Sequence, residues 1–182
     1  PDPRVTGVHA GENGHNPIDF VRAQTPAGDA LAIYSSAEAL SAHRPGDRPM
    51  ALDFRTIGLT ALIETGGRVV VNPGTDAVLL PRPAVAALAQ GDQWLPAWRD
   101  VALRELLLAE ASAACSAITD LSITYAGDGL TRVIVSVERS CFTGAANASA
   151  MKQSLTQALS HVGANRRLIA SADRVEIAPI LA

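Results

Sequence analysis

The second half of the chain carries the clearer pattern of apolar and polar positions. Apolar residues recur at helical spacing between residues 101 and 118 and again between 148 and 162, which is typical of amphipathic helices. Between these stretches, apolar and polar residues alternate on both sides of Gly127-Asp-Gly129, which indicates two strands joined by a hairpin. The predicted buried positions are Leu103, Leu106, Leu107, Ala114 and Ile118 for the first helix, Leu121, Ile123, Tyr125, Val133, Val135 and Val137 for the hairpin, and Ala148, Met151, Leu155, Leu159 and Val162 for the second helix.

With a last strand at residues 174–177, this half is predicted to run helix, strand, strand, helix, strand. An antiparallel sheet with both helices on one face would bury all three apolar stripes together. Gly163 is expected to end the second helix. The looser stretch from Ser140 to Asn147 is expected to lead into that helix as a loop.

The first half has shorter apolar runs, separated by turns rich in Gly and Pro. These runs predict a hairpin around a turn at residues 25–29, followed by a short helix at residues 37–43. Ser35, with Glu38 three residues later, is the expected capping signature of that helix. The other predicted elements are strands at residues 50–53, 68–72 and 77–80, a helix that follows Asp53, buries Phe54, Ile57, Ala61 and Leu62 and ends at Gly66, and a helix opened by Pro83 and closed by Gly91.

These elements predict an α+β fold made of two small layered subdomains, each a short sheet packed by helices. Residues 1–16, rich in Pro and Gly, are interpreted as an irregular arm, and residues 17–92 as the first domain. Residues 93–99 form a polar and aromatic connector that holds both tryptophans of the chain. Residues 100–182 are the second predicted domain.

The composition favours an aliphatic core, because 48% of the residues are hydrophobic and only 4% are aromatic. The formal net charge is −3, and charges of both signs are spread along the chain, which argues against a nucleic-acid partner. The apolar run at residues 101–118 is interrupted by Arg104, Glu105 and Glu110, so no membrane span is expected. A single lysine, Lys152, beside fourteen arginines suggests a bacterial genome of high GC content.

Two cysteines are too few for a disulfide scaffold, so Cys115 and Cys141 are expected to be reduced thiols in a cytoplasmic protein. Cys115 lies in the helical pattern and is interpreted as a core residue. Cys141 lies just past a strand, where a nucleophile would need a neighbouring base, and the nearest histidine in sequence is His161. An ordinary thiol at a strand end is the favoured interpretation. The four histidines lack metal-ligand spacing, so we expect no metal and no cofactor.

Two surfaces are candidates for binding. The turn at residues 72–76, with Asn72, Pro73 and Asp76, either presents backbone groups to a ligand or is a plain turn. Trp94 and Trp98 either form a docking patch for a protein partner or cover the seam between the two halves.

The order of features between residues 31 and 91 resembles the N-terminal domain of the SseB family. It begins with a strand that enters a short helix at residues 30–40, and continues with a helix led by Phe54. An apolar strand that ends in Asn72-Pro73 comes next, then a second strand and a helix opened by proline. Residues 100–180 resemble the C-terminal domain of the family in layout. The resemblance implies an α+β fold in a bacterial, cytoplasmic accessory protein with no established catalytic residues.

The leading hypothesis is therefore a non-enzymatic accessory protein that binds a protein partner not yet identified. A small-molecule sensor is the first alternative, because the layout of the second half is similar to ferredoxin-like regulatory modules. A cryptic enzyme that uses Cys141 is the second alternative. The sequence leaves the oligomeric state open.

Overall fold

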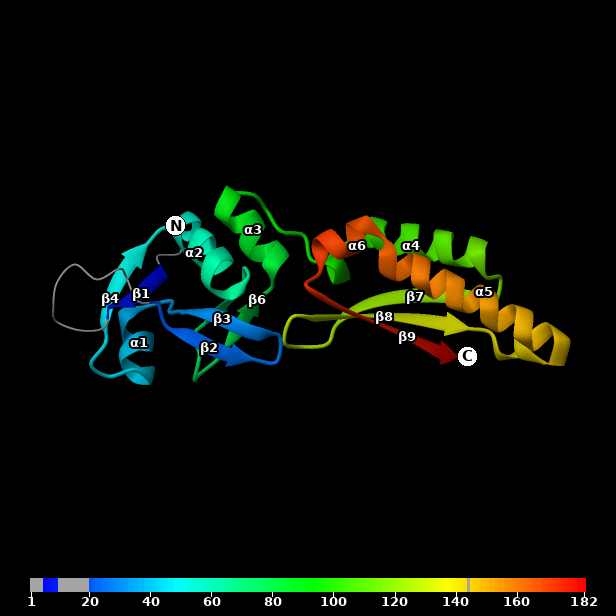
Figure 1. The fold of residues 1–182 in the computed structure, drawn as a ribbon, viewed down its shortest axis with the longest axis horizontal. Coiled ribbons are helices and arrows are strands. Elements are labelled where there is room, and N and C mark those ends of the chain that lie inside the picture. Colours follow the sequence, from blue (N-terminus) through cyan, green and yellow to red (C-terminus); the bar gives the residue numbers. More distant parts are fainter. Residues whose placement is uncertain (1–4, 10–19, 144) are drawn as a thin grey trace. The chain divides into compact units, whose positions relative to one another are not determined.

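The computed structural model describes the backbone of residues 5–9, 20–143 and 145–182, and the side chains of residues 20–143 and 148–182. The chain forms two compact units, Pro1–Trp94 and Leu95–Ala182. The boundary between them falls inside the predicted connector. Both units combine helices with a small sheet, which confirms the predicted α+β fold (Figure 1).

The N-terminal unit is built on a four-stranded sheet with the order β2-β3-β5-β6. Strands β2 (Arg22–Thr25) and β3 (Gly28–Ile33) form the predicted antiparallel hairpin. β3 pairs in parallel with β5 (Val69–Val71), and β5 pairs antiparallel with β6 (Val78–Leu80). The carboxyl ends of β3 and β5 therefore lie at the same edge of the sheet.

The described residues of this unit form three helices: α1 (Ala37–His43), α2 (Phe54–Thr65) and α3 (Arg82–Gln90). As predicted, Asp53 caps α2, and Gly91 ends α3 in the left-handed conformation. The cap of α1 is one residue later than predicted, because its side-chain acceptor is Ser36. The core between the sheet and helices α2 and α3 contains Leu31, Ile33, Ile57, Ala61, Val69 and Val85.

The predicted irregular arm contains a strand, so this part of the prediction is wrong. β1 (Val5–His9) pairs antiparallel with β4 (Arg48–Leu52) to form a separate two-stranded sheet. The two partners are about forty residues apart in the chain, and periodicity within a single segment does not reveal such a pairing. The rest of the predicted arm lies outside the described residues.

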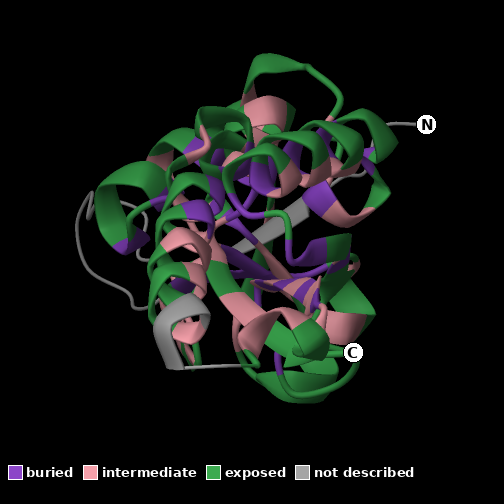
Figure 2. Ribbon diagram, turned by 90° about the vertical axis from the view of Figure 1, so that its right-hand side faces the viewer, coloured by how far each residue is buried: buried purple, intermediate pink, exposed green. Residues whose placement is uncertain are grey.

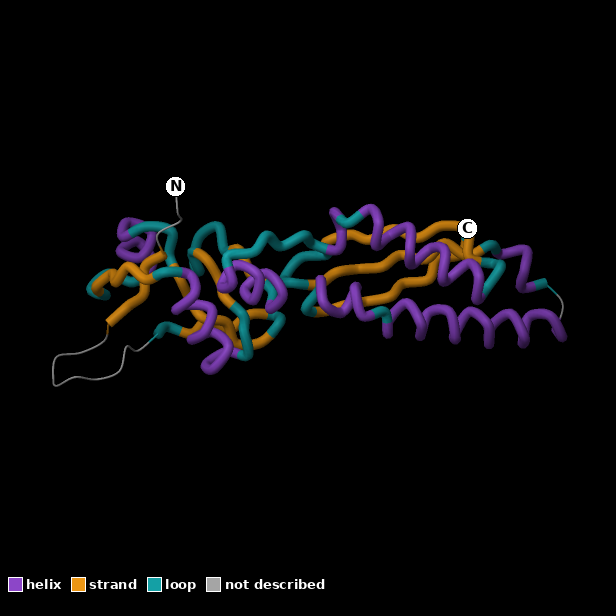
Figure 3. The backbone as a smooth tube through the Cα atoms, turned by 90° about the horizontal axis from the view of Figure 1, so that it is seen from above, coloured by secondary structure: helices purple, strands orange, loops and turns teal. Residues whose placement is uncertain are grey.

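The C-terminal unit has the predicted order of elements, with one extra helix. α4 (Val101–Ala114) leads into β7 (Ile118–Tyr125) and β8 (Leu130–Val137). The chain then continues through α5 (Ala145–Ala164) and α6 (Arg166–Ser171) to β9 (Arg174–Leu181). Helices α4 and α5 run side by side over one face of the sheet (Figures 1 and 3).

The sheet of this unit is mixed, whereas the prediction was antiparallel. β7 and β8 form the predicted hairpin, but β9 lies parallel to β8. A parallel partner needs a crossover connection, and α5 with α6 provides it. The sequence pattern missed α6, which Asn165 caps through its side chain, and Gly163 lies inside α5 instead of ending it.

The core of the C-terminal unit contains most of the predicted apolar positions, including Leu103, Leu107, Leu121, Val133 and Val135. Buried residues lie on the strands and on the inward faces of the helices, while the outer faces of the helices are exposed (Figure 2). Four further positions differ from the prediction: Leu106 and Ala114 are exposed, Tyr125 is 45% exposed, and Ile118 begins a strand. No helix in the described part of the chain is long and apolar enough to cross a bilayer.

Candidate functional site

The predicted turn at residues 72–76 follows β5 and has a defined geometry. Asn72 N donates to the carbonyl of Ile33 at 2.8 Å, and Thr75 N donates to the carbonyl of Asn72 at 3.3 Å. Gly74 has a φ of 92°, which fits the third position of a type II turn with Pro73 before it. Pro73 is buried, so it anchors the turn to the unit.

The side chain of Asn72 closes the edge where β3 and β5 both end. Its Oδ1 accepts hydrogen bonds from Ser35 N at 2.9 Å and from Ser35 Oγ at 3.2 Å. Asn72 itself has a φ of 51°, a left-handed conformation that asparagine tolerates better than most residues. The amide of Asn72 is therefore already used to bind Ser35, two residues after the end of β3.

His43, the last residue of α1, covers the other side of the turn. Its Nδ1 lies 2.8 Å from the hydroxyl of Tyr34, which is buried. A Cβ at Gly74 would lie 2.4 Å from the His43 ring, so only glycine fits there. Burial raises the pKa of Tyr34; the charge of Arg44 opposes this rise, and that of Asp47 adds to it.

The turn is thus a brace between the carboxyl ends of two parallel strands, where ligands often bind in open α/β sheets. Of its predicted site residues, Asn72 and Pro73 have structural contacts. Asp76 is exposed, and its carboxylate forms no hydrogen bond or ion pair with the described residues. A ligand at this edge would meet Asp76 and backbone groups.

The two tryptophans of the connector belong to different units. Trp94 is the last residue of the N-terminal unit and is partly buried. Trp98 lies in η1 (Ala97–Arg99) of the C-terminal unit and packs against its core. Its ring contacts that of Tyr125, with centroids 4.8 Å apart and planes tilted by 36°. Trp98 therefore supports the fold of its own unit, and substituting it would disturb the core of that unit as well as its surface.

Among the described residues, neither cysteine thiol has a neighbouring base that would activate it as a nucleophile. Cys115 is buried and its sulfur lies 3.6 Å from the sulfur of Met151. Cys141 lies in η2 (Arg139–Phe142) and packs partly against the core, and its thiol makes no hydrogen bond to a described residue. No group of three metal-ligating side chains was found within the described ranges.

Helix α2 carries a surface that the sequence interpretation missed. Leu59, Leu62 and Ile63 are 54%, 64% and 82% exposed. Their spacing of three and four residues places them on one face of the helix. Leu62 was predicted to be buried, so that prediction is wrong. Three large aliphatic side chains form a continuous exposed stripe, which we call the α2 stripe.

The α2 stripe faces outward because α2 packs on α3 through small residues. A Cβ at Gly58 would lie 2.6 Å from Cβ of Ala89, so the two helices approach closely at this point. Ile57, Gly58, Ala61 and Thr65 are the buried residues of α2. The helix therefore buries Ile57 together with small residues, and leaves Leu59, Leu62 and Ile63 exposed on its outer face.

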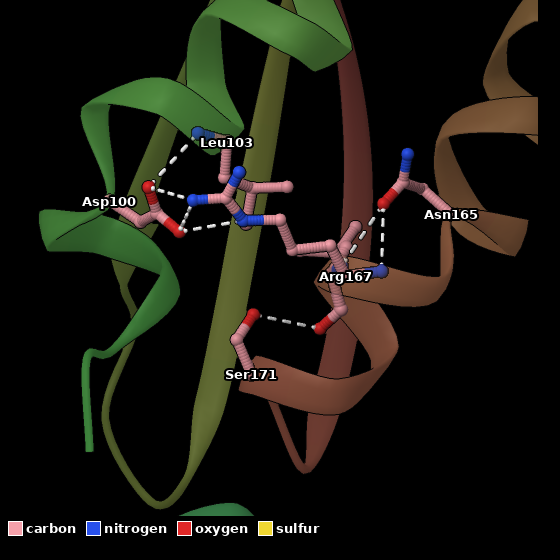
Figure 4. A network of polar contacts seen from close by, with 6 residues as sticks. Asp100, Leu103, Asn165, Arg167 and Ser171 are labelled. Atoms are coloured by element: carbon pink, nitrogen blue, oxygen red, sulfur yellow. Dashed lines mark hydrogen bonds and ion pairs between the residues drawn. The ribbon is translucent and has the colours of Figure 1, made fainter. Parts of the chain in front are cut away.

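A polar network in the C-terminal unit ties α6 to the start of α4 (Figure 4). Asp100, which is 8% exposed, accepts from Leu103 N at 3.0 Å as the cap of α4. It also accepts two hydrogen bonds from Arg167 Nη2, at 2.7 and 2.8 Å, and one from Nε at 3.1 Å. The network thus joins the first turn of α4 to α6 within the C-terminal unit.

The comparison with protein families identifies the N-terminal unit. Residues 4–87 match the family model described as the SseB protein N-terminal domain. The match confirms the predicted resemblance of the N-terminal unit to the N-terminal domain of the SseB family. The match ends before the C-terminal unit, so the likeness of residues 100–180 to the second domain of the family stays a prediction. No significant similarity to a curated protein or to a solved structure was found.

Proposed function

We propose that this chain is a non-enzymatic accessory protein of the bacterial cytoplasm that binds a protein partner through the α2 stripe. The observation that carries the proposal is the exposure of three large aliphatic side chains, Leu59, Leu62 and Ile63, on one face of α2. Exposed aliphatic clusters on soluble proteins mark interaction sites. The match of residues 4–87 to the SseB N-terminal domain is consistent with an accessory role, because the resemblance implies no established catalytic residues.

The chemistry of the stripe defines the partner it would bind. Leu59, Leu62 and Ile63 have the spacing with which one helix lies in an apolar groove or against the apolar face of another helix. Arg55, one turn before the stripe on α2, is exposed and forms no ion pair with the described residues. We expect a partner with an aliphatic groove or helix face that has a carboxylate at its rim.

The test compares two charged substitutions on different exposed helices. The double substitution Leu62→Asp with Ile63→Asp places two carboxylates in the α2 stripe. The control substitution, Ile169→Asp, places one carboxylate on α6, where Ile169 is 55% exposed. A partner that copurifies with the wild type is first identified, and its affinity for each variant is then measured by calorimetry. The stripe variant is expected to bind about tenfold more weakly or worse, because it would bury two unpaired carboxylates in an apolar interface. Ile169→Asp should bind like the wild type.

Equal affinity of all three proteins for every copurifying partner would contradict the proposal. The mass of the wild type in light scattering gives a second readout. A dimer that the stripe variant converts into a monomer would show that the stripe binds another copy of this chain. The enzyme hypothesis has its own test, since Cys141→Ser would abolish any activity that depends on that thiol.

A further inference from the structure

A second candidate binding site lies in the C-terminal unit, where the ends of β8 and β9 meet α5. The cavity there has a volume of about 340 Å³. Val137, Phe142, Leu155 and Pro179 contribute apolar walls, and Arg139 and Lys152 are the charged residues that line it. This volume is at the lower end of the range for small-molecule sites, roughly 300–1,000 Å³. The cavity thus combines apolar walls with two cations.

Both cations are available to a ligand. Neither the Arg139 guanidinium nor the Lys152 ammonium forms a hydrogen bond or ion pair with a described residue. The neighbouring carboxylate of Glu138 accepts a hydrogen bond from Ser140 N at 3.3 Å instead of pairing with them. Both side chains are long enough to keep their charged ends in water while their stems contact apolar surface. The lining contains no acidic residue.

The free edge of β9 argues against an extended peptide as the ligand. Ala182 bonds toward β8 through both its N–H and its carbonyl, to Val137 O at 2.9 Å and Arg139 N at 3.2 Å. Residues of a parallel strand alternate in the side to which their backbone groups point. Pro179, three residues earlier, therefore faces the outer edge, where it offers no N–H. Proline at an edge blocks the addition of another strand.

We propose that this cavity binds a small amphipathic anion, of the class of medium-chain carboxylic acids. The aliphatic chain would lie between Phe142, Leu155 and Pro179, and the carboxylate would pair with Arg139 and Lys152. The site is separate from the α2 stripe and does not depend on the proposed protein partner. Failure of either proposal leaves the other unaffected.

The test uses the full chain with three probes, octanoate, octan-1-ol and octyltrimethylammonium, each of which has a main chain of eight carbons when the carboxylate carbon of octanoate is counted. Binding is followed by amide chemical shifts in heteronuclear NMR. Octanoate should produce saturable shifts at Phe142, Leu155 and Leu181, and it should bind more tightly than the alcohol. The octyltrimethylammonium cation should bind most weakly, because the lining holds two positive charges and no negative one.

Two substitutions assign the charges. Lys152→Gln and Arg139→Gln should each weaken octanoate binding about two- to fivefold, the range for partly exposed ion pairs, and leave the binding of octanol unchanged. Arg166→Gln, which removes an exposed arginine outside the cavity lining, is the matched control and should change neither. The proposal is overturned if octanoate gives no saturable shifts at these amides. It is equally overturned if octanoate and octanol bind alike and neither charge substitution matters.

Discussion

The Asp100–Arg167 network makes a quantitative prediction about the C-terminal unit. Asp100 has two separate roles: its Oδ1 accepts the Leu103 N–H as the cap of α4, and its carboxylate binds Arg167 of α6 through three short contacts. The Asp100 side chain is 8% exposed, whereas that of Arg167 is 49% exposed. Substitutions at Asp100 can remove the two roles together or one at a time.

The expected magnitudes follow from these contacts. Losing the cap costs about 1 kcal/mol. Exposed ion pairs contribute roughly 0.2–1 kcal/mol, and the multiple contacts and buried carboxylate place this pair near the upper end. The half-exposed guanidinium prevents a larger value, since water screens it. Asp100→Ala should therefore lower the free energy of unfolding of the unit by about 2 kcal/mol. Asp100→Asn keeps a good capping group and should cost about 1 kcal/mol.

The assay must report on this unit alone, because a chain of two units need not unfold in one step. Amide hydrogen exchange of Val133 and Val135, in the central strand β8, meets this condition. When exchange is limited by the opening equilibrium, 2 kcal/mol corresponds to roughly thirtyfold faster exchange and 1 kcal/mol to roughly fivefold. Amides of β3 in the N-terminal unit are the internal control and should not change.

A double-mutant cycle with Arg167→Met isolates the ion pair, because methionine keeps part of the apolar stem. The coupling energy between Asp100→Asn and Arg167→Met should be about 1 kcal/mol. Coupling close to zero would refute the stabilising role of the pair. Equal losses for Asp100→Ala and Asp100→Asn would refute the separate contribution of the cap.

Two further predictions concern helix α2. Gly58→Ala should destabilise the N-terminal unit by about 1 kcal/mol, because the clash with Ala89 at 2.6 Å outweighs the gain in helix propensity. The double variant Gly58→Ala with Ala89→Gly should recover most of this loss, as measured by amide hydrogen exchange in the same unit. The pKa of Asp53 lies below its ordinary value of 3.8, first because Thr56 N donates to its carboxylate and then because the Thr56 hydroxyl does so. Its capping contribution is therefore present above pH 3.8 and is lost as the pH falls through the lower folded value; a carboxyl NMR titration midpoint at or above 3.8 would contradict this.

Local patterns in the sequence predicted the elements whose partners are close in the chain. The β7–β8 hairpin follows from alternation around Gly127 and Gly129, both of which have positive φ. The direction of β9 did not follow, because it depends on α6, a helix of six residues with too few apolar positions to show a period. The pairing of β1 with β4 joins distant segments and left no local signal.

In the candidate sites, too, local features were predictable from the sequence and contacts between distant segments were not. Asn72-Pro73 was predicted as a turn from its residue types, and the structure contains one there. Its contact with Ser35 depends on the parallel pairing of β3 and β5, which the sequence pattern does not specify. The apolar cavity near Lys152 likewise brings together α5 and the ends of two strands. Nothing in any one segment marks it, apart from the presence of the only lysine.

Helix α2 shows why an interaction surface is harder to predict than a core. The sequence of α2 has apolar residues on all sides of the helix, so their periodicity does not indicate which side is buried. Size would favour burying Leu62, yet the structure buries Gly58, because close approach to Ala89 is possible only through small residues. Burying an aliphatic side chain fully is worth about 1.5–3 kcal/mol, and the unit forgoes much of this at three positions. A fold that leaves such side chains in water is what we expect where a partner covers them, and the Leu62→Asp with Ile63→Asp variant tests that inference directly.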